Sequence, residues 1–182
     1  MRLAVLAAIS ALPLLLAACS QEAADEAEAP VEEAAAPAEN ATLDLQATGI
    51  VVPPQGGFEE LTVPFGSMRA ATEATLGNVL GEVTGSYDGQ GDCWLESTQY
   101  EGLSLQFKDD LFVGYSAEAP YVPELSRSEM LADPGVALVE DSTLGEEFTI
   151  GSGEAIISGI FAGEGDDAAV ESLWAGEVCT FR

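Results

Sequence analysis

No histidine occurs among the 182 residues of this chain. Histidine is the commonest general base in enzymes and the commonest metal ligand, so its absence excludes Ser-His-Asp and Cys-His nucleophile systems and the usual zinc sites. A Gly-x-Gly-x-x-Gly turn between a strand and a helix and a Gly-Lys-Ser/Thr phosphate loop are also missing. These absences predict a protein that is not an enzyme and that needs no cofactor.

Basic residues are nearly as scarce. The chain has five Lys and Arg residues against 32 Asp and Glu residues, which gives a formal net charge of −27 at pH 7. Charge of this sign repels nucleic acids and anionic lipid head groups, so the composition excludes nucleic acid as a partner. It allows a cationic ligand or a basic protein surface, although high negative charge also occurs simply because it keeps a protein soluble.

The first of only three cysteines, Cys19, directly follows a short apolar segment. Residues 3–18 carry no charge and follow Arg2. At about 1.5 Å per residue a helix of this length spans roughly 24 Å, less than the ~30 Å hydrocarbon core of a bilayer. A basic start, a short apolar run and small residues before a cleavage point are typical of a secretory signal peptide, here residues 1–18.

The stretch "LAAC" (residues 16–19) resembles the lipobox of bacterial lipoproteins, Leu-Ala-(Ala/Gly/Ser)-Cys. The resemblance implies that the thiol of Cys19 takes a diacylglyceryl group before cleavage. Because Ser20 rather than an aspartate follows, it also implies delivery to the outer membrane of a Gram-negative cell, with the protein facing the periplasm. An uncleaved anchor helix and an ordinary signal peptide with an incidental cysteine are the alternatives.

Residues 19–41 form an acidic segment rich in Ala, Glu and Pro. The segment has seven acidic residues and no aromatic residue, so it cannot bury enough apolar surface to offset the entropy of ordering. Like charges extend it, and Pro30 and Pro37 interrupt any helix that the alanines start. We predict a disordered spacer between the lipid and the folded domain, with an acidic tail that binds a cationic partner as the alternative.

The other two cysteines, Cys93 and Cys179, form an even pair once Cys19 is assigned to lipid. Disulfides persist in the oxidising compartments outside the cytoplasm, so we predict a structural bond that closes a loop of about 85 residues. A redox pair and a metal site are the alternatives. The chain has no Cys-x-x-Cys motif for the first and no histidine to complete a zinc shell for the second.

Residues 42–182 have the usual length of one domain, and their pattern predicts both helices and strands. "LDLQATGIVV" (Leu43–Val52) predicts an N-terminal strand. Ser67 as an N-cap and apolar residues at helical spacing up to Gly81 predict a helix over Met68–Leu80. Antiparallel strands separated by tight turns follow at Cys93–Tyr100, Leu103–Lys108 and Leu111–Ala117.

The pattern then restarts. "LSRSEML" places Ser126 three residues before Glu129, which predicts a capping box for a short helix. Three further strands are predicted at Leu144–Ile150, Glu154–Ala162 and Ala169–Ala175. The predicted fold class is therefore α+β. Two helix–three-strand units (residues 60–117 and 124–182) form one antiparallel sheet with the helices on one face, preceded by an N-terminal strand.

Three stretches carry a resemblance to a known group of proteins: "LTVPFGSMRAATEATLG", "YEGLSLQFKDDLFVGYS" and "LWAGEVCTFR". They resemble small, uncharacterised Gram-negative envelope lipoproteins with tandem helix-plus-three-strand repeats. The layout of these proteins is similar to the β-lactamase-inhibitory-protein fold and to BamE, a small outer-membrane assembly lipoprotein. The resemblance implies a non-catalytic binding or assembly module with a curved antiparallel sheet. We expect an envelope protein or a cationic ligand as its partner. The resemblance transfers no binding residue to this chain.

Calcium is the ion best suited to the acidic groups that remain. Two glycine-containing loops place flexible carboxylates together, as oxygen-coordinated calcium requires. The carboxylates are Asp88 and Asp92 in "YDGQGD" and Glu164, Asp166 and Asp167 in "GEGDD". Neither loop matches the EF-hand pattern, and solvated turns are the favoured interpretation of both. No metal site is therefore assigned.

A carboxylate-based hydrolase of envelope glycans is the main alternative to a binding module. Such an enzyme needs two carboxylates beside a sugar cleft, with aromatic platforms that Trp94 or Trp174 would supply. A tryptophan in a β-sheet is nevertheless expected to pack in the core. A calcium-dependent structural lipoprotein is the third interpretation.

Overall fold

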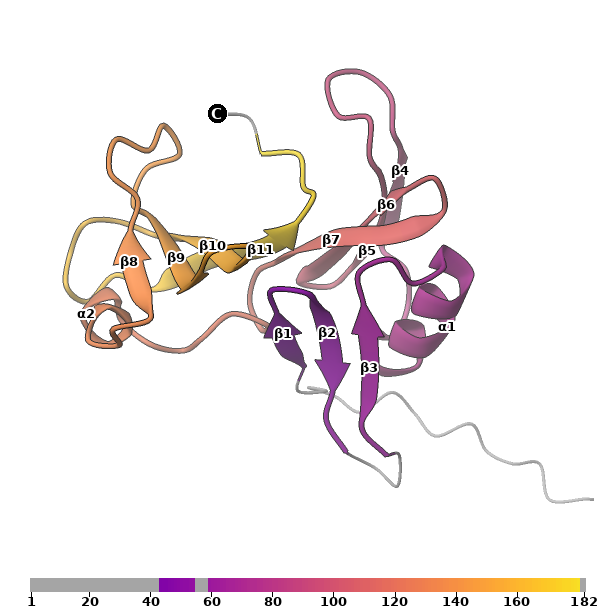
Figure 1. The fold of residues 1–182 in the computed structure, drawn as a ribbon, viewed down its shortest axis with the longest axis horizontal. Helices are drawn as coiled ribbons and strands as arrows, with labels where there is room; N and C mark the ends of the chain where they lie inside the picture. The colour runs from indigo at the N-terminus through magenta and orange to yellow at the C-terminus, as the bar shows by residue number, and fades with distance from the viewer. Residues whose placement is uncertain (1–42, 55–58, 181–182) are drawn as a thin grey trace, which may run out of the picture. The chain divides into compact units, whose positions relative to one another are not determined.

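The computed structural model describes residues 43–54 and 59–180. Within these residues the chain forms two helices and two antiparallel sheets (Figure 1). The predicted class, which combines helices with antiparallel strands, is confirmed. The predicted signal peptide (residues 1–18), Cys19 and the acidic segment 19–41 lie outside the described residues.

The smaller sheet contains the first three strands in the order β1-β2-β3. Their bounds are Asp44–Gln46, Gly49–Val52 and Leu61–Pro64. The prediction of one strand over Leu43–Val52 is wrong, because the chain turns back after Gln46 and pairs this residue with Gly49. Gly49 lies so close to the backbone of Val63 that a Cβ would collide with it. Apolar residues occur on both sides of the turn, so the sequence pattern predicts one continuous strand rather than a hairpin.

The larger sheet has eight strands in the order β4-β5-β6-β7-β11-β10-β9-β8. The first four are β4 (Gly85–Asp88), β5 (Glu96–Tyr100), β6 (Leu103–Lys108) and β7 (Leu111–Ala117). The other four are β8 (Val136–Leu138), β9 (Glu147–Ser152), β10 (Ala155–Phe161) and β11 (Val170–Gly176). The two series of strands meet where β7 pairs with β11.

Each helix is followed by four strands, so the predicted helix–three-strand units are not confirmed. α1 (Arg69–Leu80) precedes β4–β7, and α2 (Arg127–Leu131) precedes β8–β11. The unpredicted strands, β4 and β8, are short edge strands, each paired with one neighbour. The sequence of β4 includes Gly and Asp, which are depleted in strands, so pairing with β5 rather than local preference accounts for it.

The two helices begin differently. α2 has the predicted capping box: the Ser126 hydroxyl accepts a hydrogen bond from the Glu129 N–H, and the Glu129 carboxylate accepts one from the Ser126 N–H. Hydrogen bonds from the Ser126 hydroxyl and from its N–H lower the pKa of Glu129. The predicted N-cap of α1 is wrong, because Met68 occupies that position and the Ser67 hydroxyl donates instead to the Pro64 carbonyl. The predicted end of α1 at Gly81 is confirmed.

A row of residues across the larger sheet identifies its buried face. From β6 to β9 the residues opposite one another are Leu103, Ala117, Leu173, Gly159 and Phe148. The four that carry side chains are each 4% exposed or less. Leu76 of α1 packs in the same cluster as Leu103, and Met130 of α2 packs in the same cluster as Phe148. Both helices therefore cover the same face of the sheet (Figure 1).

Tyr115 of β7 joins the smaller sheet to this face. Its side chain is fully buried, and its hydroxyl donates a hydrogen bond to the Gln46 carbonyl at 3.1 Å. Burial, together with the nearby charge of Asp44, raises the pKa of Tyr115. The Phe65 ring packs against Tyr115 with 6.1 Å between ring centroids. The smaller sheet thus covers the α1 half of the core.

A charge cluster fixes α1 on the sheet. Arg69 donates from Nε to Glu73 at 2.9 Å and pairs with Glu96 of β5, while its guanidinium lies 4.8 Å from the centroid of the Phe107 ring. The Thr98 hydroxyl donates to Glu73 at 2.6 Å. Burial alone raises the pKa of Glu73, but the hydrogen bonds from Thr98 and Arg69 and the charge of Arg69 outweigh it and lower this pKa.

We expect Glu73→Gln to lower the free energy of unfolding by about 1 kcal/mol at pH 7, the scale of one typical hydrogen bond, because the Glu73 side chain is partly exposed to solvent. Because the folded pKa of Glu73 is lowered, its contribution is present above the unfolded pKa of about 4.3 and is lost as pH falls through the folded pKa. Urea unfolding at pH 7 and near pH 2 measures this, with exposed Glu82→Gln as the control. A difference between variant and wild type that stays constant with pH would contradict the role of this carboxylate.

Candidate functional site

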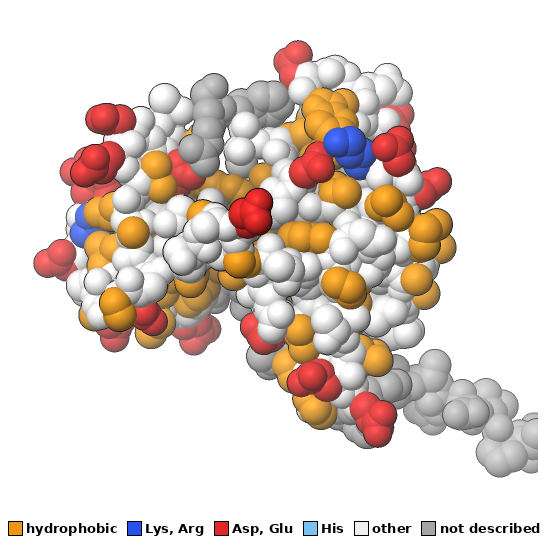
Figure 2. All heavy atoms as spheres, in the orientation of Figure 1, with side chains coloured by type: hydrophobic (Ala, Val, Ile, Leu, Met, Phe, Trp, Pro, Cys, Tyr) orange, Lys and Arg blue, Asp and Glu red, His pale blue; other side chains and the backbone are white. Residues whose placement is uncertain are grey.

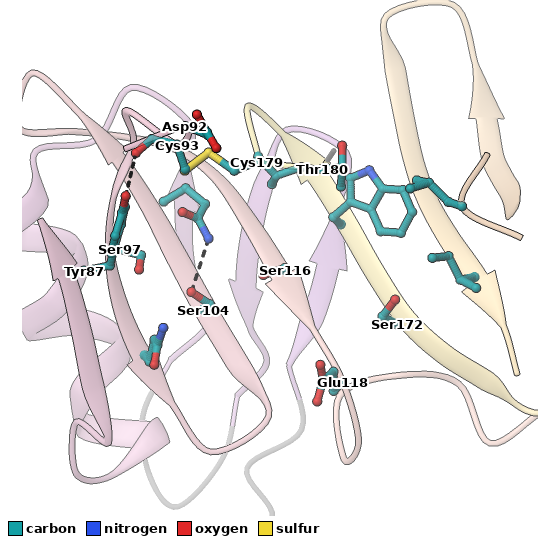
Figure 3. Close-up of a pocket in the computed structure, with 16 residues that line it drawn as sticks. Tyr87, Asp92, Cys93, Ser97, Ser104, Ser116, Glu118, Ser172, Cys179 and Thr180 are labelled. Carbon is teal, nitrogen blue, oxygen red and sulfur yellow. Dashed lines mark hydrogen bonds between the residues drawn. A yellow bond between two sulfur atoms is a disulfide. The ribbon is translucent and has the colours of Figure 1, made fainter. Parts of the chain in front are cut away.

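The face of the larger sheet opposite the helices is polar at its centre. From β5 to β11, the residues opposite one another in one row are Gln99, Ser104, Ser116 and Trp174. Ser97 and Gln106 form the start of a neighbouring row on the same face. Side chains alternate between the faces of a strand, so these residues lie between core positions along the chain. Figure 3 shows Ser104, Ser116 and Ser172 on three neighbouring strands.

The segment after β11 crosses this polar face. The Glu177 N–H donates a hydrogen bond to the Val113 carbonyl at 2.9 Å. Gly114 permits the crossing, because a Cβ there would collide with the Glu177 carbonyl. Lys108 pairs with the Glu177 carboxylate at 3.1 Å, and its ammonium lies 4.2 Å from the centroid of the Trp94 ring.

The predicted Cys93–Cys179 disulfide is confirmed. The two Cα atoms lie 5.7 Å apart, and 86 positions separate the residues in the chain. The bond joins the crossing segment to the loop that precedes β5, beside Asp92 and Thr180 (Figure 3). The C-terminal segment is therefore held over the sheet by the Glu177 N–H, by the ion pair with Lys108 and by the disulfide.

A cavity of about 720 Å³ lies between the polar sheet face and this segment (Figure 3). Neutral hydroxyl and amide groups make up much of its lining, among them Tyr87, Ser97, Gln99, Gln106, Ser116 and Ser172. A second cavity of about 280 Å³ adjoins it and shares Gln99, Ser104, Ser116, Glu118 and Ser172. We call the two together the polar groove.

Several polar side chains of the polar groove are available to a ligand. Within the described residues, Ser97, Gln99, Ser116 and Ser172 make no side-chain hydrogen bond. Ser97 is 5% exposed, yet it lines the cavity. In the described part of the chain Thr72 Oγ1 is the only fully buried side-chain oxygen or nitrogen without a partner. Because the Ser97 hydroxyl also lacks a partner, it is not a fully buried atom. The Ser97 hydroxyl is therefore accessible from the cavity.

The charge of the polar groove differs from that of the rest of the surface. Acidic side chains are spread over the face seen in Figure 2, where Lys and Arg are few. Among the described residues that line the polar groove, the charged ones are Asp92 and Glu118, and neither Lys nor Arg is present. Figure 3 shows Asp92 beside the disulfide and Glu118 at the far end of the cavity. Between them the lining is neutral.

The calcium candidates do not form a group of three or more metal ligands within the described residues. Asp88 is exposed on β4 and accepts a hydrogen bond from Gln90, while Asp92 lines the polar groove. Glu164, Asp166 and Asp167 are exposed in the loop between β10 and β11.

The two tryptophans occupy different environments. Trp174 is 7% exposed, as expected of a tryptophan in a sheet, and one side of it lines the polar groove. The expectation of core packing is wrong for Trp94, which is 56% exposed. Trp94 precedes β5 and packs on the Lys108 ammonium, a favourable interaction for an exposed indole ring.

Sequence reasoning missed the polar groove itself. The signal that was available is the polar half of the alternation in "ESTQY" and "LSLQFK", which contains Ser97, Gln99, Ser104 and Gln106. That pattern equally describes a sheet face covered by water. Only the crossing segment and the pairing of β7 with β11 turn this face into a cavity.

Comparisons with protein-family models, with curated proteins and with solved structures find no match to this chain. Among the described residues, neither helix has the length and apolar character that crossing a membrane requires. The assignment of a function therefore depends on the residues and the geometry described above.

Proposed function

We propose that this protein is a lipid-anchored outer-membrane lipoprotein that faces the periplasm and acts as a non-catalytic binding or assembly module. The observation that carries the proposal is the polar groove, a cavity in whose lining Ser97, Gln99, Ser116 and Ser172 make no side-chain hydrogen bond within the described residues. The lipobox at Cys19 and the acidic segment 19–41 support the anchored location. The lack of histidine and of nucleophile motifs supports binding rather than catalysis.

The order of elements supports a related proposal about ancestry. A helix followed by a series of antiparallel strands occurs twice, and the two series meet at β7 and β11. We propose that these are two divergent copies of one unit, as the resemblance to BamE-like and β-lactamase-inhibitory-protein-like layouts implies. The resemblance implies a binding module with a curved antiparallel sheet, which agrees with a binding role.

The anchor is tested by the N-terminal peptide of the protein purified from a Gram-negative host. Mass spectrometry is expected to show a peptide that begins at Cys19 and carries acyl chains, because lipidation precedes cleavage. Cys19→Ser is expected to yield a chain without acyl groups that keeps residues 1–18, because the cleavage that follows lipidation is blocked. A wild-type chain cleaved elsewhere and free of lipid would contradict the anchor.

The binding role is tested by affinity purification of the full chain from solubilised envelopes. Ser116→Phe fills the polar groove with a residue that strands accept, so it is expected to remove the ligands that the wild type enriches. Thr149→Phe is the matched control. Thr149 is on β9 and lies on the same face of the sheet as Ser116, but it does not line the cavity. Melting temperatures of both variants check folding. Equal enrichment by the wild type and Ser116→Phe would contradict binding in the polar groove.

Carboxylate-based hydrolysis of glycans is the second candidate function. One observation favours it: the cavity beside the Tyr87 ring has carboxylates, Asp92 and Glu118, but they lie at its two ends, whereas this reaction uses two carboxylates on either side of one bond. Release of sugar reducing ends by the wild type, abolished in both Asp92→Asn and Glu118→Gln, would establish this function in place of binding alone.

A further inference from the structure

The centre of the polar groove leaves no place for an extended peptide to join the sheet. The strands beneath it, β5, β6, β7 and β11, are each paired on both sides, and the free edge of β4 lies beyond them. A peptide that binds as an additional strand needs a free sheet edge, so that mode of recognition is excluded over these four strands. A ligand in the polar groove is bound by side chains.

The side chains select the chemistry of that ligand. Without Lys or Arg among the described lining residues, the polar groove has no partner for phosphate or another anion. Asp92 and Glu118 lie at its two ends, which leaves the centre without charge for a polycation (Figure 3). A purely apolar ligand would cover the Ser97 hydroxyl and its neighbours and leave them without hydrogen bonds.

We infer that the polar groove binds a neutral oligosaccharide. This inference rests on the proposed binding function and names its ligand class. Sugar hydroxyls both donate and accept hydrogen bonds, as do the hydroxyl of Ser97 and the amides of Gln99 and Gln106. The Tyr87 ring, 36% exposed, supplies an apolar surface for the C–H face of a sugar, and its own hydroxyl is held by the Cys93 carbonyl at 3.1 Å.

The length of the polar groove indicates several sugar units. Its serine and glutamine side chains come from four adjacent strands, β5, β6, β7 and β11. Strands lie about 4.8 Å apart, so these side chains extend over roughly 14 Å. Ser97 and Gln99 lie at one end of this distance and Ser172 at the other. A chain of sugars, rather than one monosaccharide, fits that spacing.

The test is an NMR titration of the full chain carrying Cys19→Ser, which removes the predicted lipid. The probes are the linear tetrasaccharides of glucose and of N-acetylglucosamine; spermine, inorganic phosphate and a neutral hexapeptide are the comparison ligands. At least one sugar is expected to shift the backbone amides of Ser97, Gln106 and Ser116 but not that of Thr149. Ser97→Ala is expected to weaken binding about 3- to 10-fold, the scale of one hydrogen bond. Ser158→Ala, on the same face outside the cavity, is expected to bind as the wild type does.

Three outcomes would overturn the inference: neither sugar binds, the hexapeptide or spermine binds in the polar groove instead, or Ser97→Ala and Ser158→Ala weaken sugar binding equally. The affinity purification separates this failure from failure of the proposed function. If Ser116→Phe removes an envelope ligand while no sugar binds, the polar groove is a binding site for another class of ligand. If Ser116→Phe changes nothing and no sugar binds, both proposals fall.

Discussion

Removing the Cys93–Cys179 disulfide is expected to lower the free energy of unfolding by about 4 kcal/mol. The bond links residues 86 positions apart, and in the chain-entropy model a loop of this length restricts the unfolded chain by roughly that amount. It also attaches the C-terminal segment to the loop before β5, in addition to the contacts of Glu177 with Lys108 and Val113. Urea unfolding of the protein with and without a reductant measures the loss.

Serine variants provide the control for this prediction. Cys93→Ser, Cys179→Ser and the double variant each remove the same bond, so all three are expected to lose the same stability. Each is also expected to be insensitive to reductant. Losses that add in the double variant, or a loss below about 1 kcal/mol, would show that the bond does not restrain the chain as described.

Phe148→Ala is expected to lower the free energy of unfolding by about 3–5 kcal/mol. The Phe148 ring is fully buried and stacks on Phe161 with 4.2 Å between ring centroids. Gly159 lies opposite on β10, and a Cβ there would lie 2.5 Å from the tip of the Phe148 ring. The ring thus fills space that its neighbours leave for it, and truncation opens a cavity that these neighbours cannot close.

Leu138→Ala is the matched control for Phe148→Ala. Leu138 pairs with Phe148 across β8 and β9 but is 41% exposed, so its truncation is expected to cost less than about 1 kcal/mol. Urea unfolding followed by tryptophan fluorescence measures both variants. Similar small losses in the two would show that the α2 half of the sheet does not pack as the structure indicates.

The features that were predictable from sequence are those determined by neighbouring residues. The strands Leu103–Lys108 and Leu111–Ala117 have the predicted bounds, because alternating apolar residues and a tight turn specify both their faces and their ends. The Ser126 capping box involves residues three positions apart. The disulfide was predictable for another reason: assigning Cys19 to lipid left only one pair of cysteines.

The features that were missed depend on residues distant in sequence. β4 exists because β5 pairs with it, and the hairpin of β1 and β2 is concealed by apolar residues on both sides of its turn. The polar groove needs the pairing of β7 with β11, the crossing of the segment after β11 and the space left by Gly114. None of these three has a signature in the local pattern. The polar residues could be identified, but not the cavity that they line.

The most direct test of the binding role is site-specific photocrosslinking in cells that produce the full chain. A photoreactive amino acid replaces Ser116 in the polar groove or Thr149 on the same sheet face outside it. We predict a discrete crosslinked product at position 116 and none at position 149. No product at position 116, or the same products at both positions, would contradict the account of the polar groove as the binding site of this protein.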